Sequence, residues 1–546
     1  MLFISRREAR VIVLFCCFLV TFLLLEGRVA YLQIYKGKEL AAYAVKGRTI
    51  SLRVGNFYRG DILDQQGRSL LDRQIKYDLA VFPALIEPSA SIQQLESLLP
   101  DNWQSSQPFL LSSHLSEEEA SELLSQNVSG VYPVPINQYY GPGALARHLV
   151  GYASGSLSLG KALEGSKGIE KLYDTELAPP DPTLNLGVVV DRKGEAIKGR
   201  GVRLRGAKGT VTRGKDVVLT IDRDVQEIVE NILDNHNVKG AAALIDIPSG
   251  EIRALASRPS YSYHQGKLEG EEFDRSLASY HPGSVFKIVV AAAALSEKVV
   301  DPAEKFNCTG KYVYKSGEEI SCWKEEGHGE LTFREAFANS CNSVFVEVAL
   351  RLGPQKLMDY SRLLGLEEGI VGYSLPGFRG GVVQFGNLPG QVGNAALGQE
   401  GVSISPVNLA ALAATVGAGG VYQKPTLVKE IRDHSGKTDR RIQSTEPRRV
   451  LSDFVIRELQ GMMELVVTDG TGKRAQVPEL GSAGKTGSAE TGKNDEQGPV
   501  VDAWFVGYTP LQNPQLAAAV FIEGGGTGGG QTAIIFKEIV EALQKK

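Results

Sequence analysis

The sequence predicts an α+β fold: an antiparallel sheet with packed helices, preceded by an elongated N-terminal module and one transmembrane helix. Three observations support this prediction. A chain of 546 residues is too long for one ordinary core. An apolar run without any charge extends from Val11 to Leu25. From about residue 215 onward, strand-like and helix-like segments follow one another in an order that suits a sheet covered by helices.

Composition places the chain among globular proteins and gives no sign of a nucleic-acid partner. Hydrophobic residues make up 42% of the chain and charged residues 22%, as in ordinary folded proteins. The formal net charge is only −4, so no extended basic surface is expected.

The N-terminus predicts a membrane anchor. Arg6, Arg7 and Arg10 precede the apolar run, and the continuation EGRVAYLQI lengthens it to the roughly 20 residues that a span needs. Because basic residues flank the cytoplasmic end of a span, we expect a cytoplasmic tail at 1–10, a transmembrane helix at 11–33 and an extracytoplasmic remainder. A cleaved signal peptide is the alternative, although this continuation offers no Ala-x-Ala pair.

The five cysteines fall into two groups. Cys16 and Cys17 lie in the apolar run and are expected to act as apolar filler. Cys308, Cys322 and Cys341 lie in the extracytoplasmic part, where disulfides persist. Cys308 and Cys322 are candidates for pairing across a short loop, which would leave one thiol free. No Cys/His spacing resembles a zinc site, so no metal is expected.

Residues 34–210 form the predicted N-terminal module, which consists of short pieces. Residues 57–71 alternate apolar and polar side chains around a Gln-Gly turn and predict a hairpin. Residues 116–126 predict a short exposed helix, and the breaker-rich segment 175–187 predicts a connection.

Residues 211–546 form the predicted second domain. The pattern predicts, in order, a strand at 216–221, an amphipathic helix at 222–236 with an Asp cap, a hairpin at 240–257, strands at 502–510 and 515–524, and a closing helix at 532–546. Strands at both ends of the domain with helices between them indicate one sheet with helices packed on it.

The stretch GKTGSAE at 484–490 suggests a nucleotide-binding phosphate loop, but the pattern fails. Such a loop needs a glycine five positions before its Gly-Lys, and that position holds Glu479. The residues after Thr486 are rich in Gly, Asn and Asp and show no helical period. Lys485 is therefore expected to serve an anion other than a nucleotide phosphate.

Ser284 and Lys287 form the first candidate catalytic motif, Ser-x-x-Lys. The pattern also occurs at Ser158, Ser321 and Ser482, but only Ser284 follows Pro-Gly and opens a long apolar run that predicts a buried helix. At a helix N-terminus negative charge is favoured, and a buried lysine with a lowered pKa can accept the proton of a serine hydroxyl. The alternative is a Ser cap with a first-turn lysine that reaches solvent.

Two further motifs follow along the chain. Ser340 and Asn342 form a Ser-x-Asn at the expected junction of two helices, which can aim a hydroxyl and an amide into a cleft; an ordinary helix cap is the alternative. Lys485-Thr486-Gly487 is expected at a strand edge, where Gly487 lets a substrate approach the backbone. Lys485 and the hydroxyls of Thr486 and Ser488 can hold a carboxylate there.

The order Ser-x-x-Lys, Ser-x-Asn, Lys-Thr-Gly resembles the serine acyltransferases that include penicillin-binding proteins and β-lactamases. The surrounding text, such as GHGELTFREAFANSCN, ALGQEGVSISPVNLAALAATVGAGG and DAWFVGYTP, is similar to that of penicillin-binding proteins. Upstream, YRGDILDQQGRSLL, ARHLVGYAS and KGIEKLYDTEL resemble the N-terminal module of the class B, transpeptidase-only members. With the anchor, the resemblance covers nearly the whole chain.

This resemblance implies a peptidoglycan D,D-transpeptidase that works through a serine acyl-enzyme. Ser284 would attack the D-alanyl-D-alanine bond of a stem peptide, Lys287 would be the base, and Ser340 would relay a proton to the leaving amine. Asn342 would bind the donor peptide. Lys485, Thr486 and Ser488 would hold the terminal carboxylate, and the backbone N–H groups of Ser284 and Ser488 would form the oxyanion hole.

The resemblance also implies location and partners. It predicts a single-pass protein of the bacterial cell membrane with an extracytoplasmic catalytic domain, in which residues 34–210 form a pedestal and docking surface. The implied partners are peptidoglycan stem peptides, β-lactam antibiotics, a membrane glycosyltransferase and proteins of the division or elongation machinery; no cofactor is implied. The length of the chain, with no added C-terminal module, favours the division type.

Some residues depart from the family pattern or have an open role. Many relatives carry Thr where this chain has Ser488, which keeps the hydroxyl. Asp502 stands where a histidine or another polar residue is often found, and the sequence gives no physical account of it. Arg59, Asp61 and Asp64 are either interface groups or members of salt bridges that hold the module together.

Other functions remain as alternatives. A β-lactam sensor or a β-lactamase would use the same domain, but neither explains the long N-terminal module together with a tail of about ten residues. A catalytically inactive scaffold of cell-wall assembly is a further alternative, which the three intact motifs disfavour. A Ser-His-Asp hydrolase lacks its Gly-x-Ser-x-Gly elbow, and no glycosyltransferase signature precedes the second domain.

Overall fold

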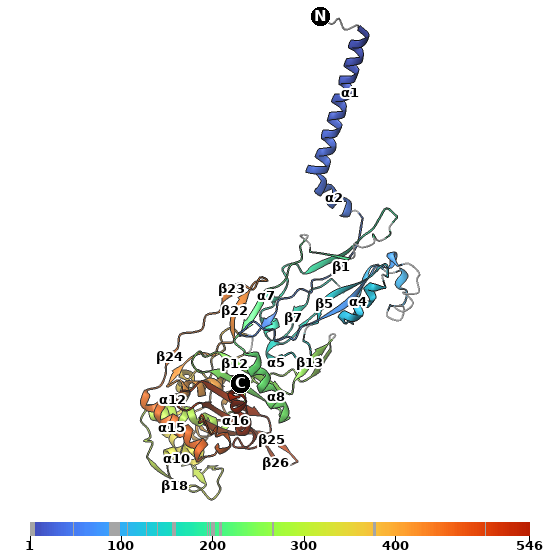
Figure 1. Cartoon of the computed structure of the whole chain (residues 1–546). Helices are drawn as coiled ribbons and strands as arrows, with labels where there is room; N and C mark the ends of the chain where they lie inside the picture. The colour runs from blue at the N-terminus through green and yellow to red at the C-terminus, as the bar shows by residue number, and fades with distance from the viewer. Residues whose placement is uncertain are drawn as a thin grey trace.

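The molecule is elongated, with a long helix at one end and the larger domain at the other (Figure 1). The computed structural model describes residues 6–545 except 47, 87–98, 106, 127, 139, 156–159, 194, 196, 198–201, 207–209, 265–266, 375–377 and 497. Of the four Ser-x-x-Lys serines, Ser158 lies outside the described residues.

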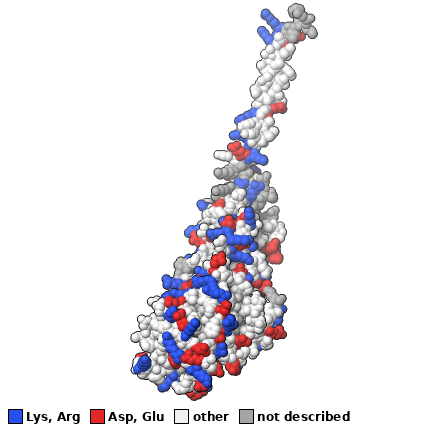
Figure 2. Space-filling view, turned by 90° about the vertical axis from the view of Figure 1, so that its left-hand side faces the viewer, with Lys and Arg blue, Asp and Glu red and all other residues white. Residues whose placement is uncertain are grey.

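The N-terminal segment is one long apolar helix. α1 spans Arg6–Ala30, continues as the π-helical turn η1 at Tyr31–Tyr35, and is followed by α2 at Gly37–Lys46. Its large apolar side chains are exposed; Phe18, for example, is 74% exposed. Arg6–Tyr35 is long and apolar enough to cross a membrane, so the predicted helix at 11–33 is present and begins five residues earlier. Figure 2 shows this apolar rod with cationic side chains at its outer end.

The N-terminal module is built on two antiparallel three-stranded sheets. One has the order β1–β8–β9 and the other β4–β3–β5. Val54, Phe82 and Leu186 belong to the core that the two sheets share. The strands are β1 (Thr49–Gly55), β3 (Gln74–Val81), β4 (Phe109–Leu115), β5 (Val131–Gln138), β8 (Thr183–Val189) and β9 (Val202–Gly206).

Shorter elements complete the module. The predicted exposed helix is α4 (Glu117–Ser125), which begins at a capping box formed by Ser116 and Glu119. The predicted connection at 175–187 is only partly right, because its second half begins strand β8. The remaining pieces are η2 (Pro83–Leu85), η4 (Trp103–Ser105), α5 (Arg147–Val150), β6 (Ala153–Ser154), β7 (Glu164–Gly165), α6 (Gly168–Leu172) and α7 (Asp174–Leu177).

A shared sheet joins the module to the second domain. β2 (Ile62–Leu63) pairs in parallel with β10 (Asp216–Leu219). The sheet continues with the antiparallel strands β22 (Val428–Arg432) and β23 (Thr438–Arg441), in the order β2–β10–β22–β23. The hairpin predicted at 57–71 is present in short form: the Asp64 N–H donates to the Arg68 carbonyl at 2.8 Å, the Leu70 N–H donates to the Ile62 carbonyl at 3.0 Å, and Leu63 and Ser69 form an antiparallel bridge. Residues 62–63 pair with β10 in addition.

The ionic residues next to this junction hold the module together. Arg59 is 1% exposed and binds Glu170 at 2.6 Å and Asp174 at 2.7 Å. The Asp61 carboxylate accepts from the Ser69 hydroxyl, and the Asp64 carboxylate accepts from Arg68. Of the two alternatives left open by the sequence, these contacts favour internal ion pairs over an exposed docking surface.

The second domain contains the predicted antiparallel sheet, in the order β12–β11–β27–β26–β25. The predicted hairpin is β11 with β12, and the two late strands are β26 and β27. Their bounds are β11 (Gly240–Asp246), β12 (Ile252–Arg258), β25 (Ala483–Asp495), β26 (Gly498–Thr509) and β27 (Leu516–Ile522).

Helices cover both faces of this sheet. α8 (Arg223–Asn235), capped by Asp222 as predicted, and α16 (Gln531–Gln544) pack on the face that carries Ala242 and Phe505. The other face, with Trp504 and Phe521, packs against buried helices that include α9 and α14. These are α9 (Lys287–Ser296), α14 (Pro406–Gly417) and α15 (Asp453–Thr468).

A helical lobe with small strands completes the domain. Its helices are α10 (Phe333–Ala338), α11 (Asn342–Leu352), α12 (Pro354–Leu363), α13 (Pro389–Ala396) and η7 (Lys473–Ala475). Its strand pairs are β15 (Lys305–Cys308) with β18 (Gly329–Thr332), β16 (Lys311–Val313) with β17 (Glu319–Ser321), β19 (Gly381–Val383) with β20 (Val402–Ile404), and β21 (Val421–Tyr422) with β24 (Arg448–Arg449). β13 (Tyr261–His264) and β14 (Lys267–Gly270) form a separate hairpin.

Candidate active site

Ser284 lies at the entrance of the central buried helix, as predicted. It belongs to the 3₁₀ turn η6 (Gly283–Phe286), and the α-helix proper begins at Lys287. All residues of α9 from Lys287 to Leu295 are buried, so the lysine does not reach solvent. The alternative of a snorkelling first-turn lysine is therefore wrong, because the Lys287 side chain is 0% exposed.

Ser340 and Asn342 lie at the junction of α10 and α11, also as predicted. Ser340 has a φ of 55°, a left-handed conformation that is costly for a residue with a Cβ. The Lys287 ammonium donates to the Ser340 carbonyl at 2.8 Å, to Ser340 Oγ at 3.2 Å and to Asn342 Oδ1 at 2.8 Å. The first two motifs thus form one hydrogen-bonded unit.

Lys485 reaches the same hydroxyl from β25, the edge strand of the sheet. Its Nζ lies 3.0 Å from Ser340 Oγ and 3.1 Å from the Thr486 carbonyl oxygen, and its side chain is 0% exposed. The three motifs therefore converge on one atom, Ser340 Oγ, although they lie far apart in the sequence.

Two buried lysines at one hydroxyl affect each other's protonation. Burial lowers the pKa of Lys287 to about 8. Burial, and then the charge of Lys287, hold the pKa of Lys485 well below its usual range. Because two adjacent cations are unfavourable in a buried site, a neutral amine is available near neutral pH to accept a proton.

Gly487 allows the Ser284 turn to approach β25 closely. A Cβ at Gly487 would lie 2.5 Å from the Pro282 carbonyl oxygen and 2.8 Å from Val285 Cγ2. On the other side of the contact, a Cβ at Gly283 would lie 2.4 Å from the Ser488 carbonyl oxygen. Absence of both side chains brings the backbones of Ser284 and Ser488 together, as an oxyanion hole between them requires.

Thr486 and Ser488 face a cavity of about 750 Å³, which also exposes Ser284, Ser340 and Asn342. The Thr486 and Thr471 hydroxyls lie 2.6 Å apart, and Ser488 Oγ accepts from the Gly528 N–H at 3.2 Å. This size suits a peptide-like ligand. Three predicted site residues do not line the cavity: Lys287 and Lys485 are buried behind its wall, and Gly487 packs against the turn that carries Ser284.

Several lining residues were not predicted from the sequence. Arg474 adds a cation at the rim. Residues 526–530 of the glycine run 524–530 provide one wall, and such a run is a signal of close approach that the sequence does carry. The structure gives Asp502 a structural role: its Oδ1 accepts a hydrogen bond from the Gly524 N–H at 3.0 Å, at the start of this glycine run. The other unpredicted lining residues are Ser321, Cys322, Trp323, Leu397, Gln399, Thr471, Glu490 and Val501.

A cluster of thiols lies directly beside the Ser340–Asn342 motif. Cys308, Cys322, Cys341 and His328 have their ligand-type atoms within 4.8 Å of one another. Spacing along the chain did not reveal this group. All five cysteines are free thiols, so the Cys308–Cys322 disulfide considered from the sequence is not formed in this structure.

The thiols are electrostatically unequal. A hydrogen bond from Cys341, together with backbone N–H groups of Lys324 and Asn342, lowers the pKa of Cys322 to about 4. The pKa of Cys341 is raised, first because its thiol donates to Cys322 and then because it is buried. Negative charge in this cluster therefore collects on the Cys322 sulfur.

Comparison with known proteins assigns the class. Residues 240–541 match the family described as penicillin binding protein transpeptidase domain. The chain is 30% identical over 534 residues to stage V sporulation protein D of Bacillus subtilis, covering 92% of this chain and 80% of that relative. It is 25% identical over 578 residues to the peptidoglycan D,D-transpeptidase FtsI of Buchnera aphidicola, covering 98% and 95%.

A solved structure extends the likeness to the whole architecture. A chain from "Structural coordination of polymerization and crosslinking by a peptidoglycan synthase complex" superposes with a TM-score of 0.72 at 25% identity, covering 98% of both chains. The present chain belongs to the penicillin-binding protein transpeptidase family, in its class B, as its three motifs and N-terminal module predict.

Proposed function

We propose that this protein is a peptidoglycan D,D-transpeptidase that forms a serine acyl-enzyme at Ser284. The observation that carries the proposal is the convergence of Lys287 and Lys485 on Ser340 Oγ, at 3.2 and 3.0 Å, beside the cavity that exposes Ser284. Relatives named peptidoglycan D,D-transpeptidase support the substrate class.

In acylation, Ser284 Oγ attacks the carbonyl carbon of the penultimate D-alanine and gives its proton to the neutral amine of Lys287. The carbonyl oxygen becomes an oxyanion, for which the N–H groups of Ser284 and Ser488 are the candidate donors. Ser340 Oγ, bonded to both lysines, passes a proton to the amine of the departing D-alanine. The C–N bond then breaks and an ester to Ser284 remains.

The terminal carboxylate of the donor peptide is recognised by groups that face the cavity and by a lysine behind its wall. Lys485 directs its hydrogen bonds to Ser340 Oγ and the Thr486 carbonyl, so it supports the carboxylate site from behind the cavity wall. The hydroxyls of Thr486 and Ser488 face the cavity and are placed to donate to the carboxylate. Arg474, at the rim, adds a cation for the same group.

The acyl group then passes to an amine of a neighbouring stem peptide, which forms the cross-link and frees Ser284. A β-lactamase would differ only in this second half, where an activated water would release the acyl group quickly. An inactive scaffold would have no use for two buried lysines hydrogen-bonded to one serine hydroxyl, because burying such groups is costly.

We further propose a membrane-anchored enzyme whose catalytic domain is outside the cytoplasm. The exposed apolar helix α1 supports the anchor, and its arginines support the orientation. The solved relative comes from a peptidoglycan synthase complex that coordinates polymerization with crosslinking, which supports a membrane glycosyltransferase as partner.

Two relatives bear on the cellular role of the enzyme. The FtsI relatives support a role in cell division, and the sporulation relative provides the competing assignment. Midcell localisation of a fluorescent fusion in growing cells would support division, and expression confined to sporulating cells would contradict it.

Covalent labelling tests the proposed enzyme. The full chain in detergent is incubated with benzylpenicillin, and its intact mass is measured beside Ser284→Ala. We expect a stable adduct in the wild type and none in Ser284→Ala. Ser321→Ala is the matched control, because Ser321 also begins a Ser-x-x-Lys and lines the same cavity, and it should still be labelled. Rapid drug hydrolysis without an adduct would instead identify a β-lactamase.

A further inference from the structure

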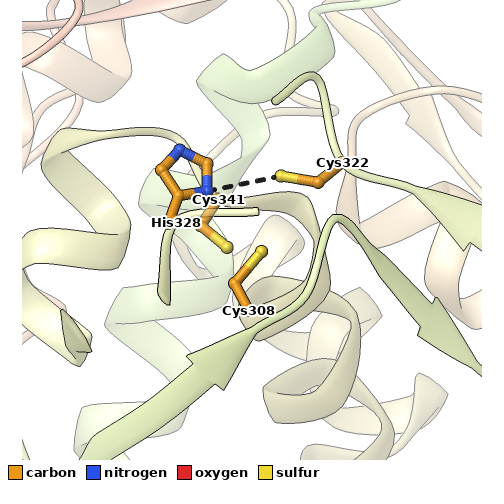
Figure 3. Close-up of side chains that lie close together, drawn as sticks. All are labelled: Cys308, Cys322, His328 and Cys341. Carbon is orange, nitrogen blue, oxygen red and sulfur yellow. Dashed lines mark hydrogen bonds between the residues drawn. The ribbon is translucent and has the colours of Figure 1, made fainter. Parts of the chain in front are cut away.

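The thiol cluster beside the active site has the composition and geometry of a metal site. Its four side chains come from four separate segments that the fold brings together (Figure 3). Cys308 ends β15, Cys322 follows β17, His328 precedes β18, and Cys341 is the residue before α11. All three cysteines that lie outside α1 are members of the cluster.

The distances approach those of a tetrahedral zinc shell. With Zn–S bonds of about 2.3 Å and a Zn–N bond of about 2.0–2.1 Å, neighbouring ligand atoms lie roughly 3.6–3.8 Å apart. Cys322 Sγ and His328 Nδ1 are 3.6 Å apart, and no two ligand atoms are more than 4.8 Å apart. A contraction of about 1 Å or less at the longest edge would complete the shell.

The surroundings of the thiols suit bound metal better than apolar packing. Cys308, Cys322 and Cys341 are 1%, 3% and 0% exposed, and His328 is half-buried. Backbone N–H groups of Lys324 and Asn342 donate to the Cys322 sulfur, as outer-shell groups do around metal ligands. His328 Nε2 is buried and has no hydrogen-bond partner among the described atoms.

We propose that Cys308, Cys322, His328 and Cys341 bind one zinc ion in a structural site. Three thiolates and one imidazole are a donor set typical of Zn²⁺, and four protein ligands leave no position open for catalysis. Binding would displace the thiol protons into solvent. The ion would also keep three neighbouring thiols from forming a disulfide.

The ion would position the second catalytic motif. Cys341 stands between Ser340 and Asn342, so a metal bond to its sulfur restrains both neighbours. The loop that carries Cys322 is already linked to this motif, because Asn342 Nδ2 donates to the Ser321 carbonyl at 3.1 Å. Trp323 Nε1 likewise donates to the Asn339 carbonyl at 3.0 Å. This catalytic consequence rests on the proposed function, whereas the metal site itself does not.

Metal content tests the site directly. The full chain is purified in detergent with a histidine-free affinity tag and without chelator, and all transition metals are quantified by mass spectrometry. We expect about one zinc per chain in the wild type. Cys308→Ser and His328→Ala should lose at least nine-tenths of it. The controls Cys16→Ser/Cys17→Ser and His434→Ala alter a cysteine pair in α1 and an exposed histidine, and should keep it. Equal zinc in all proteins, or copper or iron in its place, would overturn the proposal.

A second measurement on the wild type does not depend on the folding of variants. Zinc-edge X-ray absorption should show three sulfur neighbours at about 2.3 Å and one nitrogen at about 2.0–2.1 Å. A shell of oxygen and nitrogen alone would overturn the proposal. So would a metal-free protein that shows three titratable thiols after denaturation, where the sequence has five, because two would then be joined in a disulfide.

The positioning role has its own readout. Removing the zinc with a chelator should lower both the melting temperature and, by at least tenfold, the rate of benzylpenicillin acylation, and zinc should restore both. Ser284→Ala should retain its zinc while failing to acylate. A failure of the proposed enzyme activity would therefore leave the metal result standing, and unchanged acylation after complete zinc removal would overturn the positioning role.

Discussion

At the scale of single residues, the site depends on one serine held in an unfavourable backbone conformation. Ser340 has a φ of 55°, which costs about 1–2 kcal/mol for a residue with a Cβ. In return, its hydroxyl lies between Lys287 and Lys485, and its carbonyl accepts from Lys287. Strain of this kind is common where a catalytic group must be placed accurately.

The lowered pKa of Lys287 predicts the pH dependence of acylation. Burial lowers this pKa from 10.5 to about 8, and only the neutral amine accepts the serine proton. The acylation rate constant should therefore rise about tenfold per pH unit below that value and level off above it. Stopped-flow acylation by benzylpenicillin from about pH 6 to about pH 9 measures this. A flat profile, or a rate that falls as the pH rises, would show that Lys287 is not the base.

The sequence identified the motif residues because their order along the chain is itself informative. It did not identify the metal-type cluster, whose members are separated by 14, 6 and 13 positions (322 − 308, 328 − 322 and 341 − 328). Zinc motifs found from sequence depend on short local spacings. Here the fold, rather than any local turn, brings the four side chains together.

At the scale of elements, the contact between η6 and β25 sets the geometry of the site. Glycines at 283 and 487 remove the side chains that would hold the two backbones apart. The sequence predicted a close approach of substrate at Gly487, and the group that approaches it in the structure is the protein's own turn η6, which carries Ser284. Edge strand β25 thereby lies in close contact with η6.

Gly487→Ala should impair acylation without unfolding the protein. Its Cβ would lie 2.5 Å from the Pro282 carbonyl oxygen, so η6 must shift and one oxyanion donor is misplaced. Loss of one such donor costs about 10²–10³ in rate. The control is Gly461→Ala in α15, whose Cβ would meet nothing within 4 Å. Acylation of Gly487→Ala at the wild-type rate would contradict this account of the contact.

The buried ion pair of the N-terminal module should matter for stability. Arg59→Ala leaves Glu170, which is fully buried, without its partner, and such a loss typically costs about 3–5 kcal/mol. Arg334→Ala removes an exposed pair with Glu458 and should cost less than about 1 kcal/mol. Urea unfolding of the full chain compares the two. If Arg59→Ala lowered the free energy of unfolding as little as Arg334→Ala, Arg59 would be dispensable to the stability of the module.

Distant partners decided part of the structure of some elements. Residues 57–71 form the predicted hairpin turn, but residues 62–63 also pair with β10, more than 150 positions away, which the sequence did not indicate. Residues 183–189 follow three prolines and still form a central strand, because β1 and β9 flank them on both sides. Local composition cannot report such long-range pairing.

At the scale of the whole molecule, the fold separates the anchor from the chemistry. The larger domain, with β25 and α10 at its far end, lies at the opposite end from α1 (Figure 1). On the face shown in Figure 2, cationic and anionic side chains are interspersed over the body. The arrangement suits an enzyme that works on a polymer held away from the membrane surface.

The proposed topology predicts the labelling of introduced cysteines. A membrane-impermeant maleimide applied to intact protoplasts should label Ser435→Cys, which lies in an exposed turn of the second domain. It should not label Glu8→Cys, on the cytoplasmic side of the span, until the membrane is permeabilised. The native cysteines give little background, because they are buried or lie within α1. Labelling of both positions only after permeabilisation would contradict an extracytoplasmic domain.

If the protein is a D,D-transpeptidase, Ser284 must carry the acyl group of a D-alanyl-D-alanine peptide during the reaction, and this acyl-enzyme can be trapped. The full chain is mixed with a stem pentapeptide and quenched in acid, and its proteolytic peptides are mapped by mass spectrometry while released D-alanine is counted. We expect a shortened stem peptide in ester linkage to Ser284, with one D-alanine released per acyl-enzyme formed. An adduct on another residue, or D-alanine release that continues unchanged in Ser284→Ala, would contradict it.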